Sequence, residues 1–333
     1  MNWKDAKVTI SGVDGFIGSQ IARELLGRGA QVSGILHYPN EAGKSGLAIW
    51  GIENSVKLYA GDIANRDFLE STLTDINPTW IFHLAAQSIV TNAQLDPYRT
   101  FETNIKGTYN LLYLASTLLD VQGIIIASSD KAYGKNPILP YTENMSLKGG
   151  SAYDTSKACA DLISSNYSVQ FDLPLCITRC ANVYGPGDLH FSRIVPDTIR
   201  SVINGTRPII KGHGLHERDF IYIDDAVSGY LGLAEYLEQN RVKGEAFNFG
   251  TGNGIKIIEL VKMIIDISNS NIKEATILGR DNIAEIMKQS VDATKAHEYL
   301  GWKPRYSLRE GLKLSIDWYR DYFFNRSQSE KHL

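Results

Sequence analysis

The stretch Lys7-Val-Thr-Ile-Ser-Gly-Val-Asp-Gly-Phe-Ile-Gly18 joins a short run of β-branched residues to a helical pattern that continues from Ser19 to Leu26. A strand, a glycine turn and a helix in this order fit a dinucleotide, because the glycines let the backbone approach a pyrophosphate whose charge lies at the helix N-terminus. A tight turn with only a structural role is the alternative. We predict that a dinucleotide cofactor contacts Gly12, Gly15, Phe16, Ile17 and Gly18.

Further apolar runs of strand length occur at residues 31–36, 56–59, 80–86, 123–127 and 175–179, and they alternate with helical patterns. Such alternation predicts an α/β fold with a Rossmann-like doubly wound parallel sheet. After residue 180 the alternation gives way to mixed loops, helices and short strands. We predict a dinucleotide-binding domain at residues 1–180 with a return segment near 219–250. A smaller mixed α/β C-terminal substrate lobe would comprise residues 181–218 and 251–325.

Composition excludes several classes of function. The chain of 333 residues is 43% hydrophobic and has a net charge of −3, without the basic run of a nucleic-acid-binding protein. Its apolar stretches fall short of the ~20 residues of a membrane helix, and residues 1–11 lack a secretory pattern. The three cysteines form no CxxC pair, which favours a reducing, cytoplasmic setting. We expect no metal site and no nucleic-acid or membrane partner.

Polar residues with acid–base chemistry follow the apolar run at 123–127. Ser129, Asp130 and Lys131 would lie at the carboxyl end of a buried strand, where doubly wound sheets bind ligands. Tyr153 and Lys157 are four residues apart in a helical pattern, so they share one face. A lysine ammonium one turn from a phenol stabilises the phenolate, and we expect it to bring the pKa of about 10 towards neutrality. Tyr153 is then a base for a sugar hydroxyl, although a YxxxK pair alone also occurs by chance.

The motif GVDGFIG has the spacing GxxGxxG, and HLAAQ, TNIKGT, SSDKAYG, YDTSK, RCANVYGPGD, ERDFIYIDD, FNFGTGN and LGWKP follow it in order. Together these motifs resemble the extended short-chain dehydrogenase/reductase family, whose members act on nucleotide sugars. The Asp130-Lys131 pair, the loop and helix from Gly187 to Arg200, and the segment 287–319 are similar to its 4,6-dehydratase branch, nearest to the CDP-glucose enzymes. Arg218-Asp219-Phe220 and Asp224-Asp225 look more like the dTDP- and UDP-sugar enzymes, so the nucleotide base stays open.

The resemblance implies where the cofactor lies. Asp62 and Ile63 match the position that contacts adenine, and Leu84, Ala85 and Ala86 would let the backbone lie against the dinucleotide. The second strand ends at Leu36-His37 without the acidic residue of many NAD enzymes and without an arginine for a 2′-phosphate. The cofactor is therefore NAD or NADP, tightly bound. We interpret His83, which lies inside an apolar run, as a core residue.

The resemblance also implies an internal redox cycle. Tyr153 takes the C4 hydroxyl proton while hydride leaves C4, Lys157 holds the tyrosine ionised and grips the nicotinamide ribose, and Ser129 hydrogen-bonds the new ketone. Asp130, as the protonated acid, donates to the departing C6 hydroxyl, and hydride returns at C6. Lys131 is either the base at C5, which requires its pKa to fall by about 3 units or roughly 4 kcal/mol, or it holds Asp130 in orientation.

Four residues are predicted to bind the nucleotide-diphosphate hexose: Gln87, Asn182, Arg193 and Arg218. Guanidinium groups fit phosphate oxygens, and the resemblance assigns the diphosphate to Arg218. It also implies a homodimer, paired through the helix near 98–119 and the helix that carries Tyr153. Two other functions stay open. One is a UDP-sugar type 4-epimerase; the other is a non-catalytic NAD(P)-sensing scaffold, which typically lacks the tyrosine or the lysine.

Overall fold

The larger lobe is built on a seven-stranded sheet. This computed structural model describes residues 2–37, 45–240, 242–279 and 286–329. Within them the sheet has the strand order β10-β6-β5-β4-β1-β2-β3, and every pair is parallel. Its strands are β1 (Lys7–Ser11), β2 (Gln31–Leu36), β3 (Lys57–Ala60), β4 (Trp80–His83), β5 (Gly123–Ala127), β6 (Leu175–Cys180) and β10 (Lys243–Phe249). The predicted doubly wound parallel sheet is confirmed.

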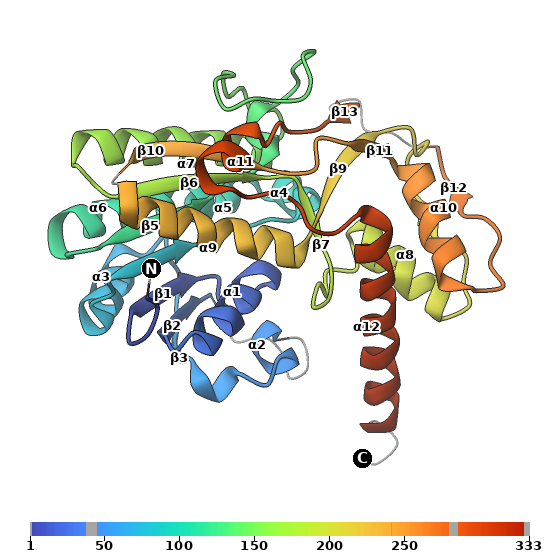
Figure 1. The fold of residues 1–333 in the computed structure, drawn as a ribbon, viewed down its shortest axis with the longest axis horizontal. Coiled ribbons are helices and arrows are strands. Elements are labelled where there is room, and N and C mark those ends of the chain that lie inside the picture. Colours follow the sequence, from blue (N-terminus) through green and yellow to red (C-terminus); the bar gives the residue numbers. More distant parts are fainter. Residues whose placement is uncertain (1, 38–44, 241, 280–285, 330–333) are drawn as a thin grey trace.

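Helices cover both faces of this sheet (Figure 1). α1 (Phe16–Gly27) and α9 (Ile223–Asn240) cover one face, and α3 (Arg66–Ile76), α6 (Gly107–Leu118) and α7 (Ala152–Gln170) cover the other. The apolar residues of β5 alternate between the two cores: Ile125 packs in the α9 core, whereas Ile124 and Ile126 pack beneath α6. A strand buried on both faces explains the uninterrupted apolar run in the sequence.

Some predicted elements differ in length. The run at 80–86 forms a strand only as far as His83. Beyond it the N–H groups of Leu84 and Ala85 both donate to the Ser11 hydroxyl, and Leu84 N also donates to the Ser11 carbonyl at 3.1 Å. The helix near 98–119 is α5 (Pro97–Phe101) and α6, joined by the π-helical turn η2 (Glu102–Lys106). Shorter elements of this lobe are α2 (Gly46–Ile49), η1 (Glu53–Ser55), α4 (Val90–Leu95), η3 (Asp130–Tyr133) and α11 (Thr294–Leu300).

The smaller lobe lies beside the carboxyl edge of the sheet (Figure 1). Its centre is β9 (Glu217–Tyr222), which pairs with β7 (Asn182–Tyr184), β11 (Gly254–Lys256) and β13 (Lys288–Gln289). α8 (Ile194–Ile203), α10 (Ile257–Ser268) and α12 (Leu308–Ser329) surround this sheet, and β8 (Ile209–Ile210) pairs with β12 (Thr276–Ile277). Within the predicted return segment, β10 is a strand of the main sheet and α9 packs against that sheet. β9 belongs to the small sheet.

Candidate active site

The glycine turn after β1 packs closely against itself and against the chain after β4, which only residues without side chains allow. Gly12 has φ +73°, and a Cβ there would lie 3.0 Å from the Ala85 backbone. A Cβ at Gly18 would lie 2.2 Å from the Gly12 carbonyl oxygen. Gly15 caps the N-terminus of α1, whose first residues are Phe16 and Ile17. The turn and the helix N-terminus therefore fit a dinucleotide pyrophosphate, which needs close backbone approach and free N–H groups.

His83 fastens this turn to the end of β4. Its Nδ1 lies 2.7 Å from the Ser11 hydroxyl and its Nε2 lies 3.0 Å from the Thr108 hydroxyl. Burial, and then the charge of Lys157, lower the pKa of His83 to about 3. The predicted core role of this histidine is confirmed. Its partner Ser11 in turn fixes Leu84 and Ala85, two of the predicted cofactor contacts; Ala86, the third, follows them.

A polar rim follows β2 and β3. The Asp62 carboxylate accepts from the Ala64 N–H at 2.9 Å, and the Asn110 amide donates to the carbonyl of Ile63 at 3.2 Å. Arg99 of α5 places one guanidinium nitrogen beside the His37 imidazole and 4.0 Å from the Asp62 carboxylate. An arginine thus lies beside the end of β2, where the sequence alone indicated no arginine for a 2′-phosphate. It comes from α5, 62 residues further along the chain.

The turn after β5 holds the predicted acid. The Ser129 hydroxyl caps η3 by accepting from Lys131 N and donates to Asp130 Oδ1 at 3.2 Å. Asp130 is buried, and its Oδ2 has no hydrogen-bond partner among the described residues. Burial raises the pKa of Asp130, while the charges of Lys131 and Arg218 and the Ser129 hydrogen bond partly offset this. A buried carboxyl with one unpartnered oxygen is suited to carry a proton.

The predicted tyrosine and lysine lie at the start of α7. Ser151 and Asp154 form a capping box at 3.3 and 3.1 Å, which begins the helix so that Tyr153 lies in its first turn. The Ser129 hydroxyl lies close enough to the Tyr153 phenol to lower its pKa, so the turn that holds Asp130 lies beside the tyrosine. Lys157 Nζ donates to the Ala127 carbonyl at 2.7 Å.

The expected lowering of the tyrosine pKa by Lys157 is not what the structure shows. Burial raises the pKa of Tyr153 to about 12, against the opposing effects of Ser129 and Arg193. Burial also lowers the pKa of Lys157 to about 8, and Asp161 works against that shift. Desolvation is therefore the larger cause for both groups, so the phenol keeps its proton near neutral pH unless further positive charge comes close.

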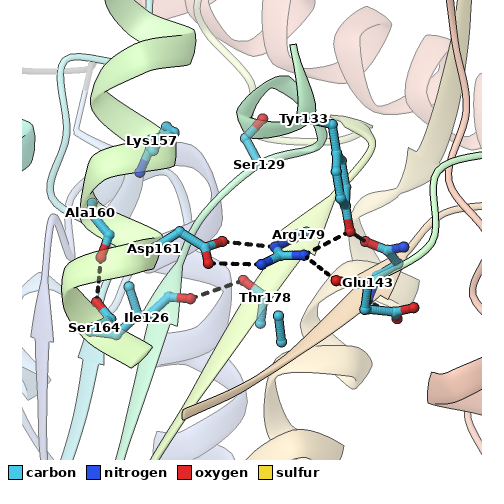
Figure 2. A network of polar contacts seen from close by, with 12 residues as sticks. Ile126, Ser129, Tyr133, Glu143, Lys157, Ala160, Asp161, Ser164, Thr178 and Arg179 are labelled. Atoms are coloured by element: carbon cyan, nitrogen blue, oxygen red, sulfur yellow. Dashed lines mark hydrogen bonds and ion pairs between the residues drawn. The ribbon is translucent and has the colours of Figure 1, made fainter. Parts of the chain in front are cut away.

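Behind this site lies a buried polar network (Figure 2). Arg179 of β6 makes a two-pronged ion pair with Asp161 of α7, with both N···O distances at 2.8 Å. The same guanidinium donates to the Tyr133 hydroxyl at 2.9 Å and to the Glu143 carbonyl at 3.2 Å. The Tyr133 hydroxyl donates to Asn248 at 2.8 Å. Because Tyr133 ends η3, the network joins the acid turn, α7 and the sheet.

The predicted substrate residues approach the site from several elements. Arg218 of β9 is buried and its charge acts on Asp130, and Arg193, at the start of α8, acts on Tyr153. Arg193 also contacts Asp188 at 3.1 Å. One N–H of Asn182 is used within the fold, since it donates to the Asp219 carbonyl at 2.9 Å.

The backbone at Gln87, the fourth predicted substrate residue, is also fixed. Asn104 accepts from the Gln87 N–H at 2.7 Å and donates to its carbonyl at 3.3 Å. The same Asn104 amide donates to Ser156 of α7 at 2.8 Å. The loop after β4 is thereby held against the helix that carries the tyrosine.

Lys131 reaches across to the smaller lobe. Its Nζ donates to the side-chain oxygen of Gln289, a residue that the sequence analysis did not single out. Within the described part of the chain no group of His, Cys, Asp and Glu has the arrangement of a metal site. Likewise, no helix in the described ranges has the length and apolarity needed to cross a membrane.

Known proteins with similar sequences include enzymes that are named for a nucleotide sugar. The CDP-glucose 4,6-dehydratase of Salmonella typhimurium is 29% identical over 339 aligned residues, which cover 96% of this chain and 91% of that protein. The dTDP-D-glucose 4,6-dehydratase of Homo sapiens is 28% identical over 346 residues, covering 98% of this chain and 93% of the relative.

Solved structures with the same fold include a UDP-glucose 4-epimerase from Thermotoga maritima with UDP-glucose. It has a TM-score of 0.86 and 28% identity, and the match covers 95% of this chain and 99% of the epimerase. The dTDP-glucose 4,6-dehydratase DesIV from Streptomyces venezuelae, solved with NAD bound, has a TM-score of 0.83 and 28% identity, with 94% and 97% covered.

A family model described as GDP-mannose 4,6 dehydratase matches residues 9–314, which is nearly the whole chain. With the parallel sheet, the glycine turn and the Tyr153–Lys157 helix in place, this match confirms the resemblance to the extended short-chain dehydrogenase/reductases and their 4,6-dehydratase branch. The chain belongs to the GDP-mannose 4,6 dehydratase family.

Proposed function

We propose that this protein is an NAD-dependent nucleotide-sugar 4,6-dehydratase, a hydro-lyase that converts a nucleotide-diphosphate hexose into its 4-keto-6-deoxy form. The observation that carries the proposal is Asp130. Its buried carboxyl has a raised pKa and lies one hydrogen bond from Ser129, which itself contacts the Tyr153 phenol. Loss of water from C6 needs a proton donor near the group that takes the C4 hydroxyl proton. Inversion at C4 needs no such additional donor.

The chain's own residues would divide the proton transfers. Tyr153 accepts the C4 hydroxyl proton once its phenol is ionised, which the positive charge of a bound oxidised nicotinamide would favour, and Ser129 hydrogen-bonds the resulting ketone. That ketone acidifies the C5 hydrogen, so a base can remove it while Asp130 protonates the departing C6 hydroxyl. Lys131, on the same turn as Asp130, is our assignment for the C5 base. A bound nicotinamide dinucleotide supplies the remaining chemistry, by accepting hydride from C4 and returning it at C6.

We assign the two ligands to the two lobes. Residues 1–180, with α9 and β10, hold the dinucleotide, whose pyrophosphate we place at the glycine turn and the N-terminus of α1. We propose that this dinucleotide is NAD and that it stays bound, since the hydride must return to the same sugar. Residues 181–218 and 251–325 hold the nucleotide sugar, with Arg218 and Arg193 on its diphosphate.

We further propose a homodimer formed through α6 and α7. Both helices leave large apolar side chains exposed, and a second copy would cover them: Tyr109, Tyr113, Leu118, Leu162 and Val169.

The described cysteines, Cys159, Cys176 and Cys180, are free thiols. Free thiols support our expectation of a reducing, cytoplasmic setting.

Incubation with a panel of UDP-, CDP-, GDP- and dTDP-hexoses tests the function. We expect one substrate to lose the mass of one water molecule and to give a product that absorbs in alkali as a 4-keto sugar does. A product of unchanged mass with inverted C4 stereochemistry would mean that the protein is a 4-epimerase. No turnover with bound cofactor would support a non-catalytic scaffold.

A further inference from the structure

One side chain of the smaller lobe enters the catalytic turn of the larger one. Gln289 of β13 is 1% exposed and makes two different hydrogen bonds. Its amide oxygen accepts from Lys131 Nζ, and its amide nitrogen donates to the Asp130 carbonyl at 2.8 Å. Only one orientation of the amide satisfies both contacts, because the ammonium is a donor and the carbonyl an acceptor.

Strand pairing fixes Gln289 in this place. β13 runs parallel to β9, with Gln289 opposite Arg218 and Lys288 opposite Glu217. Successive side chains of a strand point to opposite faces. Lys288 accordingly points outward, 62% exposed and 2.9 Å from Glu217, while Gln289 points at η3. The chain beyond β13 is held as well, because Tyr141 N donates to the Ser290 carbonyl at 2.9 Å.

We propose that Gln289 is a positioning residue for the elimination step, which fixes Lys131 and the Asp130 turn from the lobe that binds the nucleotide sugar. This inference rests on the proposed dehydratase function. The register neighbour of Gln289 is Arg218, our assignment for the diphosphate. Binding of the nucleotide at β9 and placement of the acid and base at η3 are thereby joined through one short strand.

The chemistry of the amide suits this role. A neutral oxygen orients an amine without holding its proton, whereas a carboxylate at the same place would favour the charged ammonium. The charged or titratable groups that act on Asp130 or Tyr153 come from several elements besides η3: Asp154 of α7, Arg193 at the start of α8, Arg218 of β9, Cys180 of β6 and Tyr141 of the loop after η3. Gln289 is a neutral contact in otherwise charged surroundings.

Gln289→Leu removes both hydrogen bonds at similar volume. We expect kcat for dehydration to fall roughly ten- to a hundredfold, as for a misplaced catalytic group, with KM changed by less than about twofold. C4 oxidation, followed as single-turnover reduction of the bound cofactor, should change by less than about twofold, since Tyr153 and Lys157 are untouched. Lys288→Gln is the matched control on the same strand and should leave both rates unchanged. Equal loss of oxidation and dehydration in Gln289→Leu would overturn the proposal.

Gln289→Glu distinguishes positioning from a merely structural role. It keeps an acceptor for Lys131 but adds a negative charge, so we expect the pH profile of dehydration to move upward by about one to three units. The profile of C4 oxidation should stay in place. Exchange of the C5 hydrogen with solvent deuterium, read by mass spectrometry, isolates the affected step. An unmoved dehydration profile would contradict the inference.

A second readout needs no turnover. Lysine resonances of the labelled holoenzyme, with Lys131 assigned by Lys131→Arg, give the titration of this amine by NMR. We expect a higher pKa of Lys131 in Gln289→Glu than in wild type. Identical titrations in wild type, Gln289→Leu and Gln289→Glu would refute the proposal. If wild type only epimerises C4, the proposed function fails, and this titration still decides whether Gln289 governs Lys131.

Discussion

Asp161→Asn tests whether the buried ion pair behind the active site holds α7 to the sheet. Asp161 and Arg179 are 2% and 8% exposed, and their two contacts are both 2.8 Å long. The substitution leaves the guanidinium buried with only neutral partners, the Tyr133 hydroxyl and the Glu143 carbonyl. Breaking a buried pair in this way typically costs about 3–5 kcal/mol.

The size of the effect on thermal unfolding follows from the length of the chain. An unfolding entropy of about 2.1 cal/mol/K per residue gives roughly 0.7 kcal/mol/K for 333 residues. A loss of about 3–5 kcal/mol therefore lowers Tm by about 4–7 °C. Circular dichroism at a fixed scan rate measures this shift. The same variant removes the charge that raises the pKa of Lys157, so that pKa should fall below its value of about 8.

Two further variants test whether the loss of stability comes from an unpaired buried charge. Glu24→Gln breaks an exposed pair with Arg28, whose side chains are 46% and 39% exposed, and should cost less than about 1 kcal/mol. Asp161→Leu combined with Arg179→Met removes both charges and should recover much of the loss, since no charge stays buried. If Asp161→Asn lowers Tm no more than Glu24→Gln does, the Asp161–Arg179 pair does not stabilise the packing of α7 on the sheet.

Four more variants test other parts of the site. Asp130→Asn should slow dehydration about 10²- to 10⁴-fold while single-turnover C4 oxidation persists, and equal loss of both would remove Asp130 from the acid role. Gly18→Ala should weaken dinucleotide binding in a fluorescence titration, because its Cβ would lie 2.2 Å from the Gly12 carbonyl; unchanged binding would place the cofactor elsewhere. Arg99→Ala should lower NADP affinity about ten- to a hundredfold and leave NAD nearly unchanged, and an equal effect on both would exclude a 2′-phosphate contact. Tyr113→Asp should yield monomers by sedimentation if α6 and α7 form the dimer contact.

Local patterns were enough to predict several parts of the site. The glycine spacing indicated the tight turn between β1 and α1, and the four-residue spacing of Tyr153 and Lys157 placed both on α7. The residues that escaped prediction act over long separations. Gln289 contacts a turn 158 residues earlier, and Arg99 meets His37 across 62 residues. No periodicity in the sequence encodes such pairs, because they depend on how the lobes and helices pack.

The direction of the tyrosine pKa was mispredicted for a related reason. A neighbouring lysine is visible in the sequence, and it favours an ionised phenol. Burial depends on all the segments of the chain that pack around Tyr153, and here it raises the pKa of Tyr153 to about 12. The same burial lowers the pKa of Lys157 to about 8, which weakens the ammonium that the prediction relied on.

Two buried aspartates differ in how many hydrogen bonds their carboxylates accept. Asp219 is fully buried, but it accepts hydrogen bonds from the N–H groups of Thr251, Gly252 and Val291 and from the Thr251 hydroxyl. Burial raises its pKa to about 6 even against these donors. At neutral pH this carboxylate is therefore mostly ionised, and it organises the loop after β10.

Asp130 is buried to a similar degree, but the described residues leave its Oδ2 without a donor. Ser129, which donates to the other oxygen, also acts on the Tyr153 phenol. Fewer donors stabilise a carboxylate less, and burial accordingly raises the pKa of Asp130 although the charges of Lys131 and Arg218 act against this shift. The unpartnered oxygen is thus where a departing hydroxyl would find its proton, and a donor built beside it would ionise the carboxyl and stop dehydration before it stopped oxidation.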